Sequence, residues 1–186
     1  ALSLVGSEMC IRDSYSVDNN VLTFNSNCTS IVDVNFDCSG FPSGVTSVVL
    51  QQGLQQVGQS AFRRCDKLTS VTFPETLDSV GTSAFAYCTG LASITIPEGV
   101  TTIGYWAFSE CSSLASITIP DSVTTIREYA FDGCSSLTSM SFSTMQQAIQ
   151  VDVLFGTEIV PETSIYEFRR NANDLSYLSL IHISEP

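Results

Sequence analysis

Cysteine is the residue type with the widest chemistry in this chain, and four of its seven cysteines recur every 23 residues, at Cys65, Cys88, Cys111 and Cys134. A cysteine can attack an electrophile, bind a metal or form a disulfide. Zinc and redox sites need C-x-x-C or mixed Cys/His patterns, and the chain contains neither. We therefore predict buried thiols within an apolar pattern. The alternative is a set of disulfides that pair this column two by two.

Other catalytic patterns are missing. The single histidine, His182, lies in a suspect C-terminal stretch, so no Ser–His–Asp or Cys–His arrangement can be built. No glycine-rich phosphate loop occurs. Glu75, Glu98 and Asp121 should stack as an acidic column, but one carboxylate per repeat provides too few ligands for Ca²⁺ and forms no glycosidase cleft. The sequence predicts no enzyme, no cofactor and no metal site.

The net charge is −12, and the chain has only seven lysines and arginines. Nucleic-acid binding needs a basic stripe, and anionic membranes attract basic segments, so neither is an expected partner. No apolar run approaches the roughly 20 residues of a membrane span, so no membrane insertion is expected. The acidity is best explained by solubility.

The cysteine spacing defines a repeat with two internal periods. The repeats are 45–67, 68–90, 91–113 and 114–136, with a partial repeat at 137–142. Ser-Ile-Thr-Ile-Pro at 93–97 alternates, which predicts a strand with Ile94 and Ile96 pointing inward. Ala107, Phe108 and Cys111 have the spacing of one helical or 3₁₀ turn. One coil cannot bury its apolar side chains alone, so the coils must stack with parallel strands. A continuous aromatic column is then expected from Phe62, Phe85, Phe108 and Phe131.

The pattern L-x-x-I-x-I-P-x-x-V-x-x-I-x-x-x-A-F-x-x-C resembles the BspA-like leucine-rich repeat family over residues 45–142. The resemblance implies an α/β solenoid: a right-handed coil with a parallel sheet on its concave face, short helical or 3₁₀ turns opposite, and a cap at each end. It also implies surface or secreted proteins that bind other proteins or cell surfaces. Two local departures from the pattern are Gln51 in place of proline and Arg127 in place of the corner glycine.

The ends of the chain are interpreted separately. We expect an N-terminal cap and irregular first coil at 15–44 and a C-terminal cap with a short helix at 143–177. Residues 1–14 and 178–186 resemble translated adapter or vector sequence and are set aside as non-native. The lack of a leader or anchor segment in the sequence is therefore not expected to indicate where the protein is located. In a secreted protein Cys28 and Cys38 would form a cap disulfide; otherwise they are ordinary buried thiols.

Two surfaces are candidate ligand sites. The outward strand positions form a small, polar, uncharged face made of Ser70, Thr72, Ser93, Thr95, Ser116 and Thr118. On the turn opposite the strands lie Tyr105, Trp106 and Tyr129. These aromatic residues either pack on the convex side or serve as partially exposed anchors, since binding hot spots favour tryptophan and tyrosine.

These features predict a non-catalytic, monomeric adhesion or recognition module, extracellular or at the cell surface, that binds another protein or a surface glycan. The step from fold to function is analogy. A structural spacer within a larger surface protein is the alternative, because repeats two to four are nearly identical. An ice-binding face built from the Ser/Thr columns is a third hypothesis, which curvature of the sheet would oppose.

Overall fold

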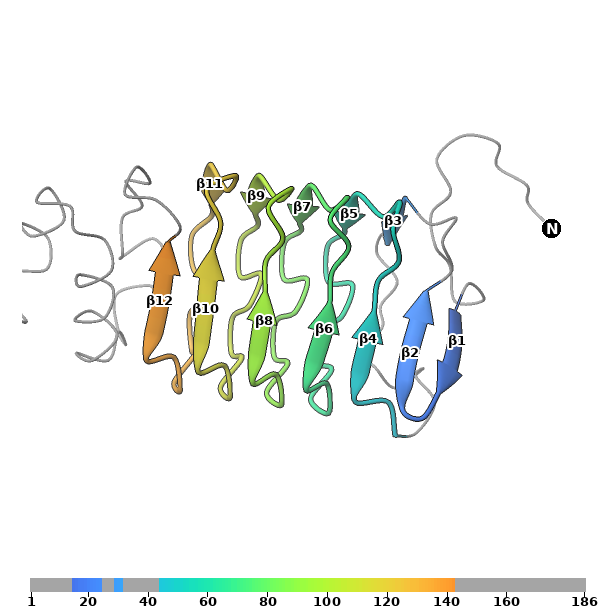
Figure 1. The fold of residues 1–186 in the computed structure, drawn as a ribbon. Helices are drawn as coiled ribbons and strands as arrows, with labels where there is room; N and C mark the ends of the chain where they lie inside the picture. Colours follow the sequence, from blue (N-terminus) through green and yellow to red (C-terminus); the bar gives the residue numbers. More distant parts are fainter. Residues whose placement is uncertain (1–14, 25–28, 32–43, 143–186) are drawn as a thin grey trace, which may run out of the picture.

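The computed structural model describes residues 15–24, 29–31 and 44–142, and this part contains twelve strands and no helix. A hairpin comprises β1 (Tyr15–Asp18) and β2 (Val21–Phe24). One longer strand per coil follows: β4 (Ser47–Val49), β6 (Ser70–Thr72), β8 (Ser93–Thr95), β10 (Ser116–Ile119) and β12 (Ser139–Phe142). A two-residue strand also recurs: β3 (Ser30–Ile31), β5 (Gln56–Val57), β7 (Ser79–Val80), β9 (Thr102–Ile103) and β11 (Thr125–Ile126). Figure 1 shows the coils stacked in one row.

The longer strands form the front face of the solenoid. β1-β2-β4-β6 make one sheet and β8-β10-β12 another, and β6 lies beside β8 (Figure 1). Apart from the β1–β2 hairpin, these strands pair in parallel, with equivalent repeat positions opposite each other, such as Ser93 and Ser116. The predicted alternation is confirmed, because Ile94 and Ile117 are buried while the serine and threonine neighbours are exposed.

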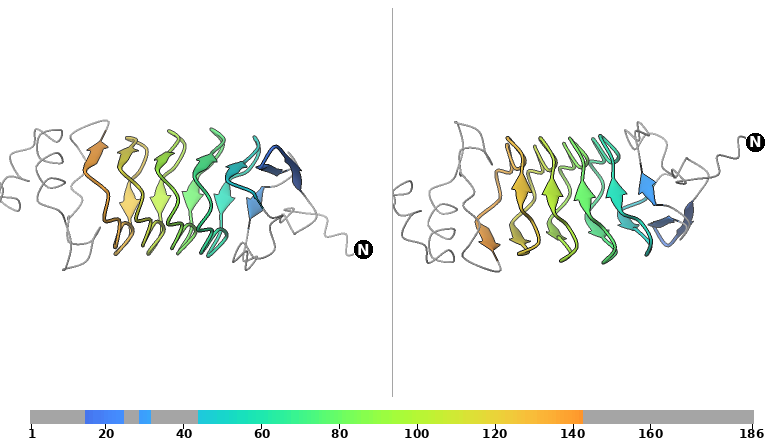
Figure 2. Two further views of the ribbon diagram at one scale, coloured as in Figure 1. Left: turned by 90° about the horizontal axis from the view of Figure 1, so that it is seen from below. Right: turned by 90° about the horizontal axis from the view of Figure 1, so that it is seen from above.

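A second parallel sheet, β11-β9-β7-β5-β3, lies on another side of the coils, as Figure 2 shows from below and above. We did not predict it from the sequence. Its strands are two residues long, so each contributes a single inward residue, for example Val80 or Ile103, and shows no alternation. These residues were recognised only as part of the apolar pattern.

The predicted helical or 3₁₀ turn is wrong within the described residues. Its N–H groups alternate between two kinds of acceptor. Ser83, Phe85 and Tyr87 donate to the carbonyls of Tyr105, Ala107 and Ser109 in the next coil. Ala84, Ala86 and Cys88 donate to Gly81, Ser83 and Phe85, three residues back. Ser83 and Tyr87 have left-handed φ angles of 55° and 64°, which a helix does not allow. The segment is a series of turns that bonds laterally to its neighbour.

The predicted aromatic column is confirmed. Phe62, Phe85, Phe108 and Phe131 are fully buried, with successive ring centroids 5.1, 5.5 and 5.5 Å apart and interplanar angles of 9°, 5° and 7°. Phe24 of the hairpin contacts Phe62 edge-on at 6.0 Å. Each ring therefore covers the ring of the next coil, which couples the stability of neighbouring repeats.

The cysteine column divides into two kinds. Cys88, Cys111 and Cys134 are buried and free, so our prediction of buried thiols is confirmed for them. Cys65 is disulfide-bonded, so the prediction is wrong for this position, and its partner lies outside the described residues. The column is not bridged two by two. The expected Cys28–Cys38 disulfide also lies outside the described residues, as do the predicted C-terminal cap and both end segments.

Candidate binding surfaces

The front face carries the predicted hydroxyl columns. All six candidate residues, Ser70, Thr72, Ser93, Thr95, Ser116 and Thr118, are exposed. Equivalent residues lie in register, and the hydroxyls of Ser47 and Ser70 are 2.8 Å apart. The side chains are short and uncharged and repeat with little change. The face can therefore form many weak hydrogen bonds, but it has none of the aromatic or arginine anchors that concentrate binding energy.

The structure brings the three predicted aromatic residues together at one corner. We call Tyr105, Trp106 and Tyr129 the aromatic corner; their exposed fractions are 37%, 43% and 37%. The rings of Trp106 and Tyr129 stack at 5.8 Å with an interplanar angle of 5°, and Tyr105 lies 5.8 Å from Trp106 at a tilt of 40°. These rings do not belong to the buried core, and more than a third of each side chain is exposed.

The backbone at this corner is strained for residues of this size. Trp106 and Tyr129 have φ angles of 52° and 60°, in the left-handed region, and so do the equivalent Ser60 and Ser83. This conformation costs a non-glycine residue roughly 1–2 kcal/mol. Large rings at positions where glycine would be more stable favour a role for the side chains themselves.

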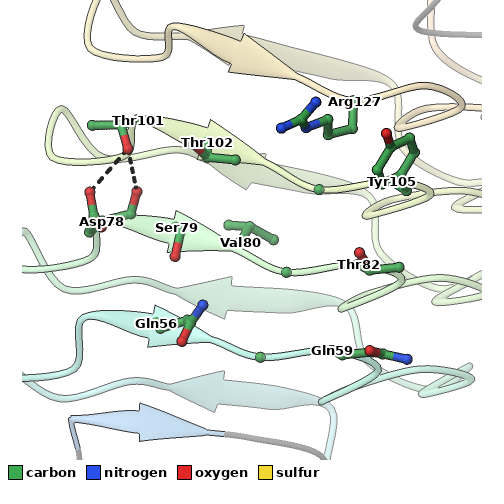
Figure 3. Close-up of a pocket in the computed structure, with 13 residues that line it drawn as sticks. Gln56, Gln59, Asp78, Ser79, Val80, Thr82, Thr101, Thr102, Tyr105 and Arg127 are labelled. Carbon is green, nitrogen blue, oxygen red and sulfur yellow. Dashed lines mark hydrogen bonds between the residues drawn. The ribbon is translucent and has the colours of Figure 1, made fainter.

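An open groove of about 590 Å³ lies over the second sheet (Figure 3). Its lining includes side chains from three successive coils, with Arg127 of a fourth coil at one end. The main polar residues are Gln56, Gln59, Asp78, Ser79, Thr82, Thr101 and Thr102. Tyr105 of the aromatic corner also lines the groove. This site could not be predicted from the sequence, because the two-residue strands beneath it show no alternation of apolar and polar residues.

Glycines leave the groove open. Gly58, Gly81 and Gly104 hold one repeat position and line the groove. A Cβ on Gly104 would lie 2.6 Å from the carbonyl carbon of Gly81, and a Cβ on Gly81 would lie 2.8 Å from that of Gly58. Close stacking of these coils therefore requires glycine at positions 81 and 104. Arg127 takes this position in the fourth coil, and this departure from the pattern was the available sequence signal.

The charges at the groove lie on opposite sides (Figure 3). The Asp78 carboxylate accepts a hydrogen bond of 3.0 Å from the Thr101 hydroxyl. The Arg127 guanidinium lies 5.7 Å from the centroid of the Tyr105 ring, within cation–π range. No residue in the described part of the chain forms an ion pair with Arg127. Its charge therefore remains available to an anion.

A separate cation–π cluster lies outside the groove. Arg63 and Arg64 each place their guanidinium carbon 5.6 Å from the centroid of Tyr87, which is 41% exposed. Among the described residues no group of three or more His, Cys, Asp and Glu side chains is arranged to hold a metal ion. That same part of the chain has no helix of the length and hydropathy needed to cross a membrane.

Three solved structures are similar to this fold. A leucine-rich cell surface protein from Faecalibacterium prausnitzii is 29% identical with a TM-score of 0.64, and the match covers 77% of this chain and 36% of that one. The leucine-rich repeat protein TpLRR of T. pallidum is 24% identical with a TM-score of 0.60, over 72% and 71%. The pneumococcal vaccine antigen PcpA is 18% identical with a TM-score of 0.64, over 79% and 35%. The last two similarities show the fold alone.

The first of these comparisons spans about a third of that relative's length. No curated protein matches the chain in sequence. The family model described as the BspA type leucine rich repeat region, in six copies, matches residues 55–171, which is more than half of the chain. This match agrees with the 23-residue coils of the structure. The chain belongs to the BspA-type leucine-rich repeat family.

Proposed function

We propose that this chain is a non-catalytic recognition module of a bacterial surface protein, and that it binds a protein or glycan partner through the aromatic corner. The supporting observation is where the repeats differ. The front rows are serine and threonine in the second to fourth coils, with Val49 as the exception in the first coil. The corner rows change from Ser83 to Trp106 to Tyr129, and from Thr82 to Tyr105 to Glu128. A change from small to large aromatic side chains at one exposed corner is the pattern expected of a ligand surface on a regular scaffold.

The geometry of the corner suits a binding anchor. Trp106 and Tyr129 are already stacked, so their rotamers are restricted before a partner arrives, which lowers the entropy cost of binding. Both rings still expose more than a third of their surface and can bury it against a partner. Aromatic side chains in such positions are the most frequent hot spots of interfaces.

Location at the cell surface or outside the cell is part of the proposal. The relative from Faecalibacterium prausnitzii is described as a cell surface protein. The disulfide of Cys65 supports an oxidising compartment, because structural disulfides persist there and are rare in the cytosol.

The test is binding of the purified chain to immobilised candidate matrix and host-surface proteins and glycans. We expect the double variant Trp106→Ala/Tyr129→Ala to bind about 30-fold more weakly, the loss typical of hot-spot truncation. The matched control is Ser70→Ala/Thr95→Ala on the front face, which should change affinity less than about twofold, since exposed neutral hydrogen bonds contribute little. If the corner variant kept full affinity and the front-face variant lost it, the binding site would lie on the front strands instead.

A structural spacer is the second candidate, and the uniform front rows favour it. A spacer needs regular stacking and no distinct surface. It therefore predicts that the repeats of related proteins keep serine or glycine at the corner positions. Varied aromatic and charged residues at those positions would favour recognition instead.

A further inference from the structure

We infer that the groove over the second sheet binds a carboxylate-bearing glycan, with the carboxylate at Arg127. The inference rests on the proposed recognition role and adds a ligand class at a neighbouring site, which shares Tyr105 with the aromatic corner. The groove lies over the second sheet and not over the front strands. Most of its lining residues lie in β5, β7 and β9 or directly next to them, and Arg127 follows β11.

The lining matches the hydroxyl groups of a sugar. Gln56 and Gln59 present amides, which both donate and accept hydrogen bonds, and Ser79, Thr82 and Thr102 present hydroxyls. Gln56 and Gln59 are exposed and the three hydroxyl residues are partly exposed, so all can reach a ligand. Tyr105 adds an aromatic side chain next to these polar groups. Ligand sites commonly combine aromatic and polar side chains in this way.

The repeat also gives the groove a regular spacing along the solenoid axis. Successive strands of a parallel sheet are about 4.8 Å apart, which is close to the length of one pyranose unit in an extended chain. Gln56, Ser79 and Thr102 hold the same register position in three paired strands. An oligosaccharide aligned with the axis can therefore meet a polar side chain at each successive sugar ring.

A peptide fits this groove less well. Peptides that bind along a sheet need free main-chain donors and acceptors or apolar side-chain pockets. The backbone under the groove is already used between coils, as in the bonds from Gly81 N to Val57 O and from Gly104 N to Val80 O. The aliphatic lining residue Val80 is only 1% exposed, so it offers no pocket.

Arg127 determines the charge of the ligand. It replaces glycine only in the fourth coil, it lies beside Tyr105, and no described carboxylate neutralises it. Guanidinium groups bind carboxylates through two parallel hydrogen bonds. Asp78 is on the other side of the groove and is bonded to Thr101, so it does not compete for Arg127 (Figure 3).

The test uses linear oligosaccharides in matched acidic and neutral forms: trigalacturonic acid and its methyl ester, and sialyllactose and lactose. Binding to the full chain is measured by calorimetry and saturation-transfer NMR. We expect at least one acidic member to bind more tightly than its neutral counterpart. The variant Arg127→Ala should bind that acidic member about tenfold more weakly and should lose the preference for acid.

Two matched variants serve as controls. Arg63→Ala removes an equally exposed arginine beside a tyrosine outside the groove and should leave binding unchanged. Ser79→Phe fills the groove and should abolish binding, whereas Ser70→Phe makes the same change on the front face and should not. Absence of binding by every acidic member, equal binding of the acidic and neutral forms, or equal effects of Arg127→Ala and Arg63→Ala would each overturn the inference.

Two further measurements separate the possible explanations. Tighter binding of tetraglutamate than of the acidic sugars would show that the groove recognises a peptide and would reject the glycan assignment. The Trp106→Ala/Tyr129→Ala variant should keep its glycan affinity, because neither residue lines the groove. If this variant also keeps its affinity for protein partners, the proposed function fails while the groove assignment stands.

Discussion

At the residue scale, the cysteines act as hydrogen-bond donors inside the core. The Sγ atoms of Cys88, Cys111 and Cys134 donate to the carbonyls of Phe62, Phe85 and Phe108 of the preceding coil, at 3.1, 3.2 and 3.2 Å. Burial raises the pKa of all three thiols, that of Cys111 from 9.0 to about 12. A small apolar side chain with one weak donor therefore fits this position.

These thiols should make the fold sensitive to alkali. Below pH 9 the thiols are protonated in both states, and their contribution to stability is fully present. As the pH rises from 9 toward 12, the unfolded chain loses its protons first, so stability falls by up to about 1.4 kcal/mol per pH unit for each thiol. We expect the thermal unfolding midpoint to fall over this range.

The control for this prediction is the triple variant Cys88→Ala/Cys111→Ala/Cys134→Ala. It should be less stable at neutral pH and should have a shallower decline in alkali, since it lacks the three buried thiols and is otherwise identical. Parallel declines in the two proteins would contradict the assignment of the alkaline effect to the thiols.

At the element scale, the conformation of the turn that follows each strand of the second sheet cannot be predicted from local residue spacing. The i, i+1, i+4 spacing of Ala107, Phe108 and Cys111 fits a helical turn as well as it fits consecutive β-turns. The choice depends on the next coil, whose carbonyls accept every second N–H group. Left-handed residues at two places in each turn complete this pattern.

Glycine substitution at Ser83 tests this assignment. The residue has a φ of 55°, so Ser83→Gly should relieve strain and raise the free energy of unfolding by about 0.5–1 kcal/mol, after the entropy cost of glycine is subtracted. Ser83→Ala keeps the strain and should give no such gain. Chemical denaturation measures both variants. In a helix the order would be reversed, because glycine is about 1 kcal/mol worse than alanine there.

At the scale of the whole molecule, stability comes from contacts between coils. The phenylalanine column links the four full repeats, and paired strands link each described repeat to the next. A defect in one coil should therefore weaken its neighbours, as in other quasi-one-dimensional repeat proteins.

Phe108→Ala is the most direct test of this coupling, because the ring stacks on Phe85 on one side and Phe131 on the other. We expect a loss of about 3–5 kcal/mol in the free energy of unfolding and a smaller loss for Phe108→Leu, which retains more volume. Hydrogen exchange should quicken at the Phe85 amide, which donates to Ala107. A loss confined to amides within the mutated coil would argue against coupling.

The disulfide of Cys65 gives a second test at this scale. The protein is produced under oxidising conditions, denatured without reductant and treated with an alkylating agent. Cys88, Cys111 and Cys134 should then be alkylated, whereas Cys65 should not. Peptide mapping by mass spectrometry checks this result and identifies the partner. Alkylation of Cys65 before reduction would contradict the disulfide and remove one argument for the cell surface.

The sequence by itself determined the repeat length, the front strands, the phenylalanine column and the buried state of three thiols, because these depend on periodic apolar residues that any stacked coil must bury. Only the tertiary structure decided the turn conformation, the second sheet, the groove and the disulfide of Cys65. Each of these depends on contacts between residues about 23 or more positions apart, such as the bonds between Thr101 and Asp78 or between Gly104 and Val80. Arg127 shows the difference: the sequence marks it as a departure from glycine, and the fold places its charge beside Tyr105 at the end of a groove.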